Sequence, residues 1–280
     1  MTRDLLRVGV LVGILLLFGV SLNGAPVKTG EGGVTLPIVW GDMGARLVAA
    51  GVIDAAKWQA LYKASGAFTA EDEALLTGMN TGKLVMNPEN AGYLLNLFWA
   101  VGLANKNPIL EDRKGMMNPA YGGAQNFAST GGWTLARSTS SGQAGDAMAH
   151  YDAHALITLT PAEQALVERM ALGIYRPCCD NPASFPDCNH GMALLGLLEM
   201  MASQGASEEE MWQAALAANE FWFPDTYRTI DAYLAQNGNE REKAGPQELL
   251  GAKFSSASGY ANIAAEVAKP QQQSGGSCGT

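Results

Sequence analysis

The sequence has few of the side chains that usually carry catalysis or bind nucleic acid. Its 280 residues include three histidines and four cysteines, and 18 basic residues stand against 27 acidic ones, for a net charge of −9. An acidic chain without a basic patch repels phosphate, which excludes nucleic acid as a partner. Four cysteines are also too few for a disulfide scaffold of this length.

Several motifs of common enzyme classes are missing as well. The chain has no P-loop, no dinucleotide-binding glycine fingerprint, no H-E-x-x-H zinc motif and no C-x-x-C-H haem-attachment motif. The sequence therefore does not support a P-loop nucleotide-binding protein, a dinucleotide-binding enzyme, a zinc protease of this type or a c-type cytochrome. The cysteines and histidines are then the main candidates for metal-binding or catalytic residues.

The composition predicts a helical fold. Val, Ile and Thr are sparse, whereas Ala, Leu, Met and Glu, which favour helix, are plentiful. Apolar residues make up 48% of the chain, which is enough for a sizeable core. We expect a mainly α fold, a multi-helix bundle built from αα-hairpins with a Cys/His-rich loop between two helices.

The N-terminal residues 1–25 have the pattern of a signal anchor or a signal peptide. Arg3 and Arg7 precede an uncharged apolar run, and Asn23 stands where a cleavage site needs a small residue. We therefore expect an uncleaved anchor. Because the positive flank stays inside, the body is expected to be extracytoplasmic, periplasmic or at the cell surface, and held to the membrane by this segment.

The rest of the chain divides by composition. Local signals predict helix starts at Asp54, at Thr69 with Asp72, and at two capping boxes that begin at Thr160 and Ser207. A first helix is expected over 39–51. The predicted segments are a Gly-rich linker (26–37), an N-terminal helical region (38–106), a long loop (107–147), a C-terminal helical region with the Cys/His loop (148–268) and a flexible tail (269–280).

The segment Tyr175–Met192 concentrates the soft-ligand side chains. Pro182 and Pro186 disfavour a continuous helix here, so the segment is expected to be a stiff loop between two helices. Its candidate ligands are Cys178, Cys179, Cys188 and His190. His150 and His154 lie upstream at a spacing of four, which on a helix would point them in one direction.

These residue types favour a soft transition metal. Thiolate and imidazole are the usual protein ligands of zinc and copper, and three cysteines with one histidine complete a tetrahedral site. We therefore predict that Cys178, Cys179, Cys188 and His190 bind copper or zinc, with His150 and His154 as auxiliary ligands. The sequence does not separate the two metals.

A local resemblance suggests a second function. The run IYRPCCDN (174–181), followed by LLGLLEMMASQGASEEEMWQAAL, resembles the haem-handling thiol oxidoreductases of cytochrome c maturation (the H-type component) over residues 174–216. The resemblance implies a membrane-anchored, exported protein with a three-helix bundle and with Cys178 and Cys179 as redox positions. The family has Cys-x-x-Cys, whereas here the cysteines are adjacent and Cys188-Asn189-His190 follows.

Two alternatives to metal binding therefore stay open. In an oxidising compartment Cys188 could pair with Cys178 or Cys179 in thiol–disulfide exchange. Cys278 in the tail could reach the loop, since ten flexible residues span on the order of 15–20 Å, and act as a resolving thiol or further ligand. The third possibility is a helical adaptor that binds a partner protein. In that case a disulfide or a zinc ion would only stabilise the structure of the loop.

Overall fold

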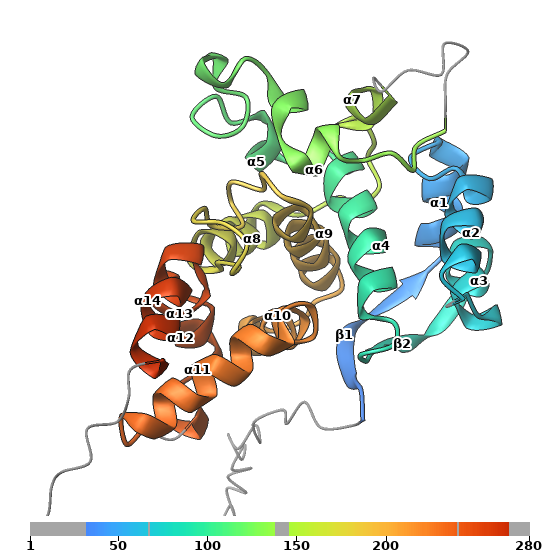
Figure 1. Cartoon of the computed structure of the whole chain (residues 1–280). Coiled ribbons are helices and arrows are strands. Elements are labelled where there is room, and N and C mark those ends of the chain that lie inside the picture. Colours follow the sequence, from blue (N-terminus) through green and yellow to red (C-terminus); the bar gives the residue numbers. More distant parts are fainter. Residues whose placement is uncertain (1–31, 67, 138–145, 240, 269–280) are drawn as a thin grey trace, which may run out of the picture.

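Two helices that are apolar on nearly every face lie against each other at the centre of the fold. Figure 1 shows the computed structural model, which describes residues 32–66, 68–137, 146–239 and 241–268. Helix α4 (Ala91–Ala104) buries twelve of its fourteen residues, and α9 (Asn189–Ser203) is buried throughout from 191 to 202. Helices without a polar face belong in a core, so this pair forms the centre on which the other elements pack.

The N-terminal part, drawn in blue in Figure 1, contains a small sheet beside three helices. Strands β1 (Val34–Gly41) and β2 (Asn80–Met86) pair antiparallel, with Val34 opposite Met86 and Gly41 opposite Asn80. The helices between them are α1 (Met43–Ala50), α2 (Ala55–Ala64) and α3 (Ala70–Thr77).

The prediction of a helix over 39–51 was wrong in its first residues, and the sheet was not predicted. Residues 34–41 alternate between buried and more exposed positions, which is the period of a half-buried strand. This strand begins inside the expected Gly-rich linker 26–37, and the helix that follows it begins only at Met43.

The segment expected to be a long loop over 107–147 contains short helices. They are α5 (Pro108–Glu111), the 3-10 turns η1 (Pro119–Tyr121) and η2 (Ala124–Asn126), and α6 (Ala128–Gly131), with α7 (Asp146–His150) at its end. The side chains of Asn107 and Asn118 accept hydrogen bonds from backbone N–H groups in the first turns of α5 and η1. These N-caps help to stabilise helical segments that are only three or four residues long.

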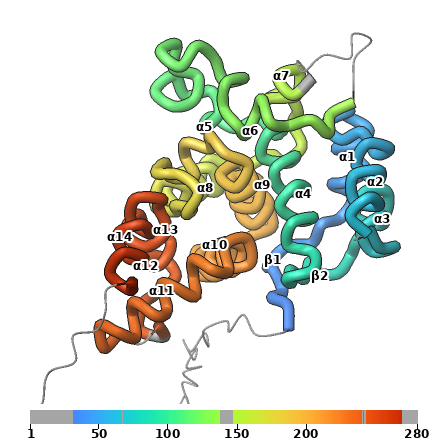
Figure 2. Tube along the Cα trace, in the orientation of Figure 1, coloured from blue at the N-terminus to red at the C-terminus, as the bar shows by residue number. Residues whose placement is uncertain are grey.

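The C-terminal part is helical, as predicted. It comprises α8 (Pro161–Gly173), α10 (Glu208–Trp222), α11 (Pro224–Gln236), η3 (Arg241–Lys243), α12 (Pro246–Leu250), α13 (Ala252–Ser255) and α14 (Ala257–Val267). The capping boxes at Thr160 and Ser207 are confirmed, as is the N-cap at Asp54. Figure 2 shows α11–α14 on one side of the α4–α9 pair and α1–α3 on the other, while α10 lies beside β1.

Helix α9 is held in place along its whole length. At its middle, Gly102 of α4 and Gly196 of α9 let the backbones touch: a Cβ at Gly102 would lie 2.1 Å from the Met192 carbonyl oxygen. At its end, the Gln204 side chain accepts from Val39 N–H (2.7 Å) and donates to Val39 C=O (3.0 Å), which ties α9 to β1. Its first residue follows the cysteine loop, so the fold fixes where that loop ends.

One carboxyl group is enclosed beside the same helix pair. Glu199 of α9 is fully buried, and Asn107 Nδ2 donates a hydrogen bond to its Oε1 at 2.6 Å. Its Oε2 has no hydrogen-bond partner among the described residues. Burial raises the pKa of Glu199 to about 8, so the group stays mainly protonated at neutral pH.

Two predicted segments lie outside the described residues. They are the signal anchor or signal peptide of residues 1–25 and the tail 269–280 with Cys278. Among the residues that the structure does describe, no helix combines the length and the apolar character needed to cross a bilayer.

The close contact of α4 with α9 predicts opposite effects for two glycines of α4. Gly102→Ala should lower the free energy of unfolding by about 1–3 kcal/mol, because the added methyl group meets a backbone carbonyl. Gly92→Ala, where a Cβ meets no described atom within 4 Å, should raise it by about 0.5–1 kcal/mol. Urea unfolding of both variants measures the difference, and equal effects would contradict the close helix contact.

Candidate metal centre

The cysteine loop connects α8 to α9 and is fastened to its surroundings by backbone hydrogen bonds. Tyr175 N–H donates to the Leu250 carbonyl (2.8 Å), and Ala183 N–H donates to the Ile174 carbonyl (2.8 Å). Near its far end, Ser129 N–H donates to the Asp187 carbonyl at 3.0 Å. The loop expected between two helices is therefore present. One of these bonds lies within the loop, and the other two hold it to α12 and α6.

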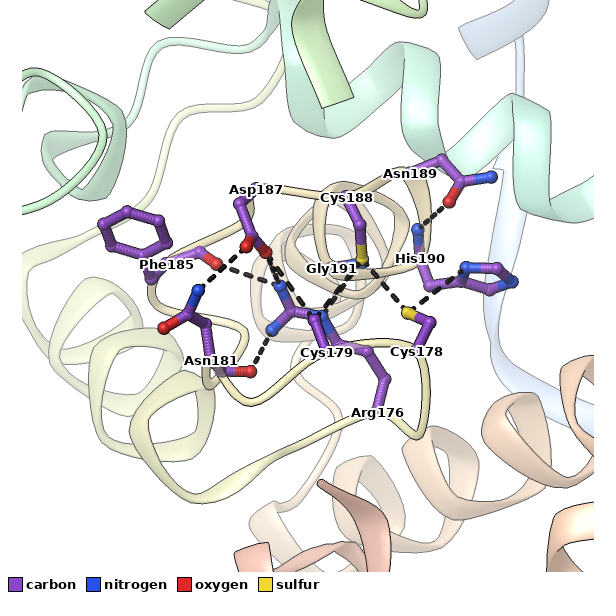
Figure 3. Close-up of polar contacts among 10 residues, drawn as sticks. All are labelled: Arg176, Cys178, Cys179, Asn181, Phe185, Asp187, Cys188, Asn189, His190 and Gly191. Carbon is purple, nitrogen blue, oxygen red and sulfur yellow. Dashed lines mark hydrogen bonds and ion pairs between the residues drawn. The ribbon is translucent and has the colours of Figure 1, made fainter. Parts of the chain in front are cut away.

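The buried guanidinium of Arg176 organises the inside of this loop. The side chain has no solvent exposure, and Figure 3 shows its N–H groups pointing at loop residues on several sides. Nη1 donates to the Asn181 carbonyl (2.5 Å), Nη2 donates to the Phe185 carbonyl (3.0 Å) and pairs with Asp187, and Nε donates to Cys188 Sγ (3.2 Å). One side chain thus joins the start of the loop to its end.

Gly191, in the first turn of α9, leaves the space that Arg176 occupies. A Cβ at Gly191 would lie 2.6 Å from Arg176 Cζ, which is closer than side-chain carbons approach other atoms. Any larger residue at this position would therefore displace the guanidinium. The helix and the arginine fit together only because position 191 has no side chain.

Cys188 is the N-cap residue of α9. Its sulfur accepts a hydrogen bond from Gly191 N–H at 3.4 Å, as the side chain of a Ser or Asp N-cap would. The N-terminus of a helix stabilises negative charge, and the neighbouring guanidinium of Arg176 adds to this effect. The position therefore suits a thiolate.

The three cysteine sulfurs gather at one point. Cys178 Sγ lies 3.3 Å and Cys179 Sγ lies 3.8 Å from Cys188 Sγ, and all three sulfurs lie within 4.8 Å of one another. All three are free thiols, with Cys178 exposed and the other two partly buried. This group of three could hold a metal ion.

The three thiols differ in acidity. Hydrogen bonds from Cys178 and Cys179, together with the charge of Arg176, lower the pKa of Cys188. The hydrogen bonds with Cys179 and Cys188 raise the pKa of Cys178. For Cys179 the hydrogen bond with Cys178 lowers the pKa, but the bond to Cys188 and burial outweigh it and raise the value to about 12. Of the three thiols, Cys188 is therefore the one that its surroundings make easiest to deprotonate.

His190 lies at the edge of the cysteine group. Its Nδ1 is 3.8 Å from Cys178 Sγ, so that in Figure 3 the Cys178 sulfur lies between Cys188 and His190. The imidazole packs on Phe223, with ring centroids 4.4 Å apart, and meets the edge of Trp222 at 5.7 Å. These aromatic contacts orient the ring beside the sulfurs.

The structure places His150 and His154 together but outside this group. His150 ends α7, and His154 forms an isolated bridge with Asn105 after the end of α4, so the two do not share a helix. His150 Nδ1 nevertheless lies 2.9 Å from His154 Nε2, and the rings stack. Within the described residues, the set of mutually close ligand atoms contains the three cysteines and neither of these histidines.

Sequence reasoning missed Arg176, Asp187 and Gly191 as parts of the site. A usable signal was present, since Arg176 is the one cation between positions 174 and 189 of the sequence and Asp187 directly precedes Cys188. A lone cation in a loop next to buried helices needs partners from that loop.

Comparisons of the chain with protein-family models, with curated proteins and with solved structures found no match. The functional argument therefore depends on the residues and their geometry.

The buried arginine predicts a large loss of stability on truncation. Arg176→Ala should lower the free energy of unfolding by about 3–5 kcal/mol, because it removes the cation that pairs with Asp187 and leaves two carbonyls of the loop without their donor. Arg169→Ala is the matched control. Its pair with Glu208 is about half exposed on both sides, so solvent screens the pair and its loss should change the free energy of unfolding much less than the loss of Arg176.

Denaturant unfolding of both variants checks this prediction, with Arg176→Lys as an intermediate that keeps the charge but loses the fork of donors. Equal destabilisation by Arg176→Ala and Arg169→Ala would show that the guanidinium does not organise the loop.

Proposed function

We propose that the protein binds one soft transition-metal ion, copper or zinc. The ligands are the thiolates of Cys178, Cys179 and Cys188, and the His190 imidazole completes the coordination. This donor set is the one that zinc and copper(I) prefer over harder cations. His150 and His154 are left out of the proposed ligands, because their rings contact each other, whereas His190 Nδ1 lies 3.8 Å from Cys178 Sγ.

The spacing of the sulfurs is the observation that carries the proposal. At a zinc–sulfur distance of about 2.3 Å, the corners of a tetrahedron lie about 3.8 Å apart. The separations of Cys178 and Cys179 from Cys188 are 3.3 and 3.8 Å, and His190 Nδ1 is 3.8 Å from Cys178 Sγ. The three sulfurs thus already lie near the spacing that a shared ion requires, and His190 lies beside one of them, outside the set of mutually close ligand atoms.

The surroundings of the cysteines support the same interpretation. Three thiolates with a divalent ion carry one net negative charge, which the buried guanidinium of Arg176 faces at Cys188. Outer groups that hydrogen-bond to metal ligands orient them and tune the metal, and Arg176 and Gly191 N–H fill that role for the Cys188 sulfur. Cys178 is exposed, which gives an ion a path of entry.

The cellular setting is part of the proposal. The basic flank and apolar run of residues 1–25 support an extracytoplasmic protein that is held to the membrane at its N-terminus. In an oxidising compartment a bound metal would also protect clustered thiols from pairing.

Metal loading of the full chain in a Cys278→Ser background tests the proposal. The protein should bind about one equivalent of zinc or copper(I), and the ion should protect Cys178, Cys179 and Cys188 from alkylation. Cys188→Ser should abolish stable binding, because it removes the central sulfur and the one that is most readily deprotonated. Elemental analysis measures the metal content, and peptide mapping measures the extent of alkylation at each cysteine.

The double variant His150→Ala, His154→Ala is the control and should keep the full metal content. Loss of metal from this control, or an unchanged metal content in Cys188→Ser, would show that the ligand assignment is wrong.

A thiol–disulfide oxidoreductase is the second candidate, and the acidity of Cys188 favours it. A thiolate at a helix N-terminus beside an arginine is a good nucleophile, and Cys178 Sγ, 3.3 Å away, could resolve a mixed disulfide. The resemblance of residues 174–216 to thiol oxidoreductases points the same way. Metal-free protein with a readily reducible Cys178–Cys188 disulfide, at a potential of about −120 to −270 mV, would favour this function.

A further inference from the structure

The three sulfurs of the cysteine group are held to very different degrees. Cys188 Sγ accepts from Arg176 Nε (3.2 Å) and from Gly191 N–H (3.4 Å), and its backbone begins α9. These contacts use donors that are themselves fixed, since Arg176 is fully buried. Cys188 is therefore the sulfur that the fold anchors most firmly.

Cys179 is anchored by a second element. Its carbonyl accepts from Ala257 N–H (3.0 Å) at the start of α14, and its sulfur lies 3.7 Å from Asp187 Oδ1. The next residue, Asp180, accepts from Ser258 N–H at 2.7 Å and so ties the same stretch to α14. Movement of Cys179 would require α14 to lose two hydrogen bonds.

Cys178 lacks comparable support among the described residues. It is the exposed cysteine, and the contacts of its sulfur are with Cys188, Cys179 and His190, which belong to the proposed site itself. A bound ion would therefore have two ligands whose positions the fold fixes, Cys179 and Cys188. Its third sulfur ligand, Cys178, would lie on the solvent side and could move away from the ion.

We propose that the centre passes its metal to, or receives it from, a thiol of another molecule by exchange that begins at Cys178, while Cys179 and Cys188 are exchanged only after it. This inference rests on the proposed function and assigns the centre to metal transfer instead of permanent structural binding. The partner is defined by its chemistry as a carrier of an accessible thiol.

The exchange step balances without an oxidant. The sulfur of the incoming thiol forms a bond to the metal as the bond from the metal to Cys178 Sγ breaks, and the proton of the incoming thiol passes to Cys178. The metal keeps its oxidation state and its number of sulfur ligands. Two further exchanges of the same kind, at Cys179 and Cys188, and dissociation of the neutral His190 imidazole from the metal complete the release, and reversal of the sequence loads the site.

Two arms of one experiment test this proposal on the zinc-loaded full chain in the Cys278→Ser background. In the first arm, limited iodoacetamide labelling followed by peptide mapping should modify Cys178 first, while zinc is still bound. In the second arm, the rate of zinc loss should rise in proportion to the concentration of added thiol. The thiols are glutathione as a small carrier and metal-free metallothionein as a protein carrier.

Substitution separates the roles of the sulfurs. Cys178→Ser should still bind zinc through Cys179, Cys188 and His190 and should transfer it to thiols about tenfold faster, because the exchange position is already open. Cys179→Ser is the matched control and should leave Cys178 as the first residue to be alkylated. Faster loss to metallothionein than to glutathione at equal thiol concentration would assign the partner as a protein.

Two results would overturn the proposal without affecting the proposed function. One is stoichiometric zinc whose loss is independent of the concentration of both thiols. The other is labelling of all three cysteines together, only as zinc leaves. Absence of bound zinc in the unsubstituted cysteine group would instead contradict the proposed function itself.

Discussion

The buried guanidinium of Arg176 is the constraint on which the cysteine group depends. A charge without solvent contact is stable only when its donors are satisfied, and this one finds its partners within its own loop and at the start of α9. Because the partners include Asp187 and Cys188, the arginine draws the end of the loop back onto its beginning. The sulfurs at 178, 179 and 188 meet as a consequence, and Gly191 provides the space.

Helix α9 carries this local arrangement into the rest of the fold. Its N-terminus supplies the cap position of Cys188, its middle touches α4 at Gly102 and Gly196, and its end is tied to β1 by Gln204. The stable core thus fixes one wall of the site, while Cys178 stays at the surface. A firm base with one exposed ligand suits a centre that must hold an ion and still exchange it.

The features that could be predicted from the sequence are those that depend on residues close together in the chain. The capping boxes at Thr160 and Ser207 satisfy backbone groups three residues away, so their helix starts were predictable. The mainly helical fold and the loop between α8 and α9 followed from composition and prolines. Strand β1 was missed because its partner β2 lies some fifty residues later, and a strand is stabilised by such distant pairing. The role of Arg176 was missed because its burial is set by tertiary packing. The upstream histidines meet each other, as their spacing suggested, but neither belongs to the set of mutually close ligand atoms among the described residues.

X-ray absorption spectroscopy of the zinc-loaded protein tests the central claim most directly, because it counts the atoms bound to the ion. The account predicts three sulfurs at about 2.3 Å and one nitrogen at about 2.0–2.1 Å from zinc. In Cys188→Ser this sulfur-rich signal should disappear. A shell made only of nitrogen and oxygen, or an unchanged sulfur count in Cys188→Ser, would contradict a metal centre built on the cysteines that Arg176 brings together.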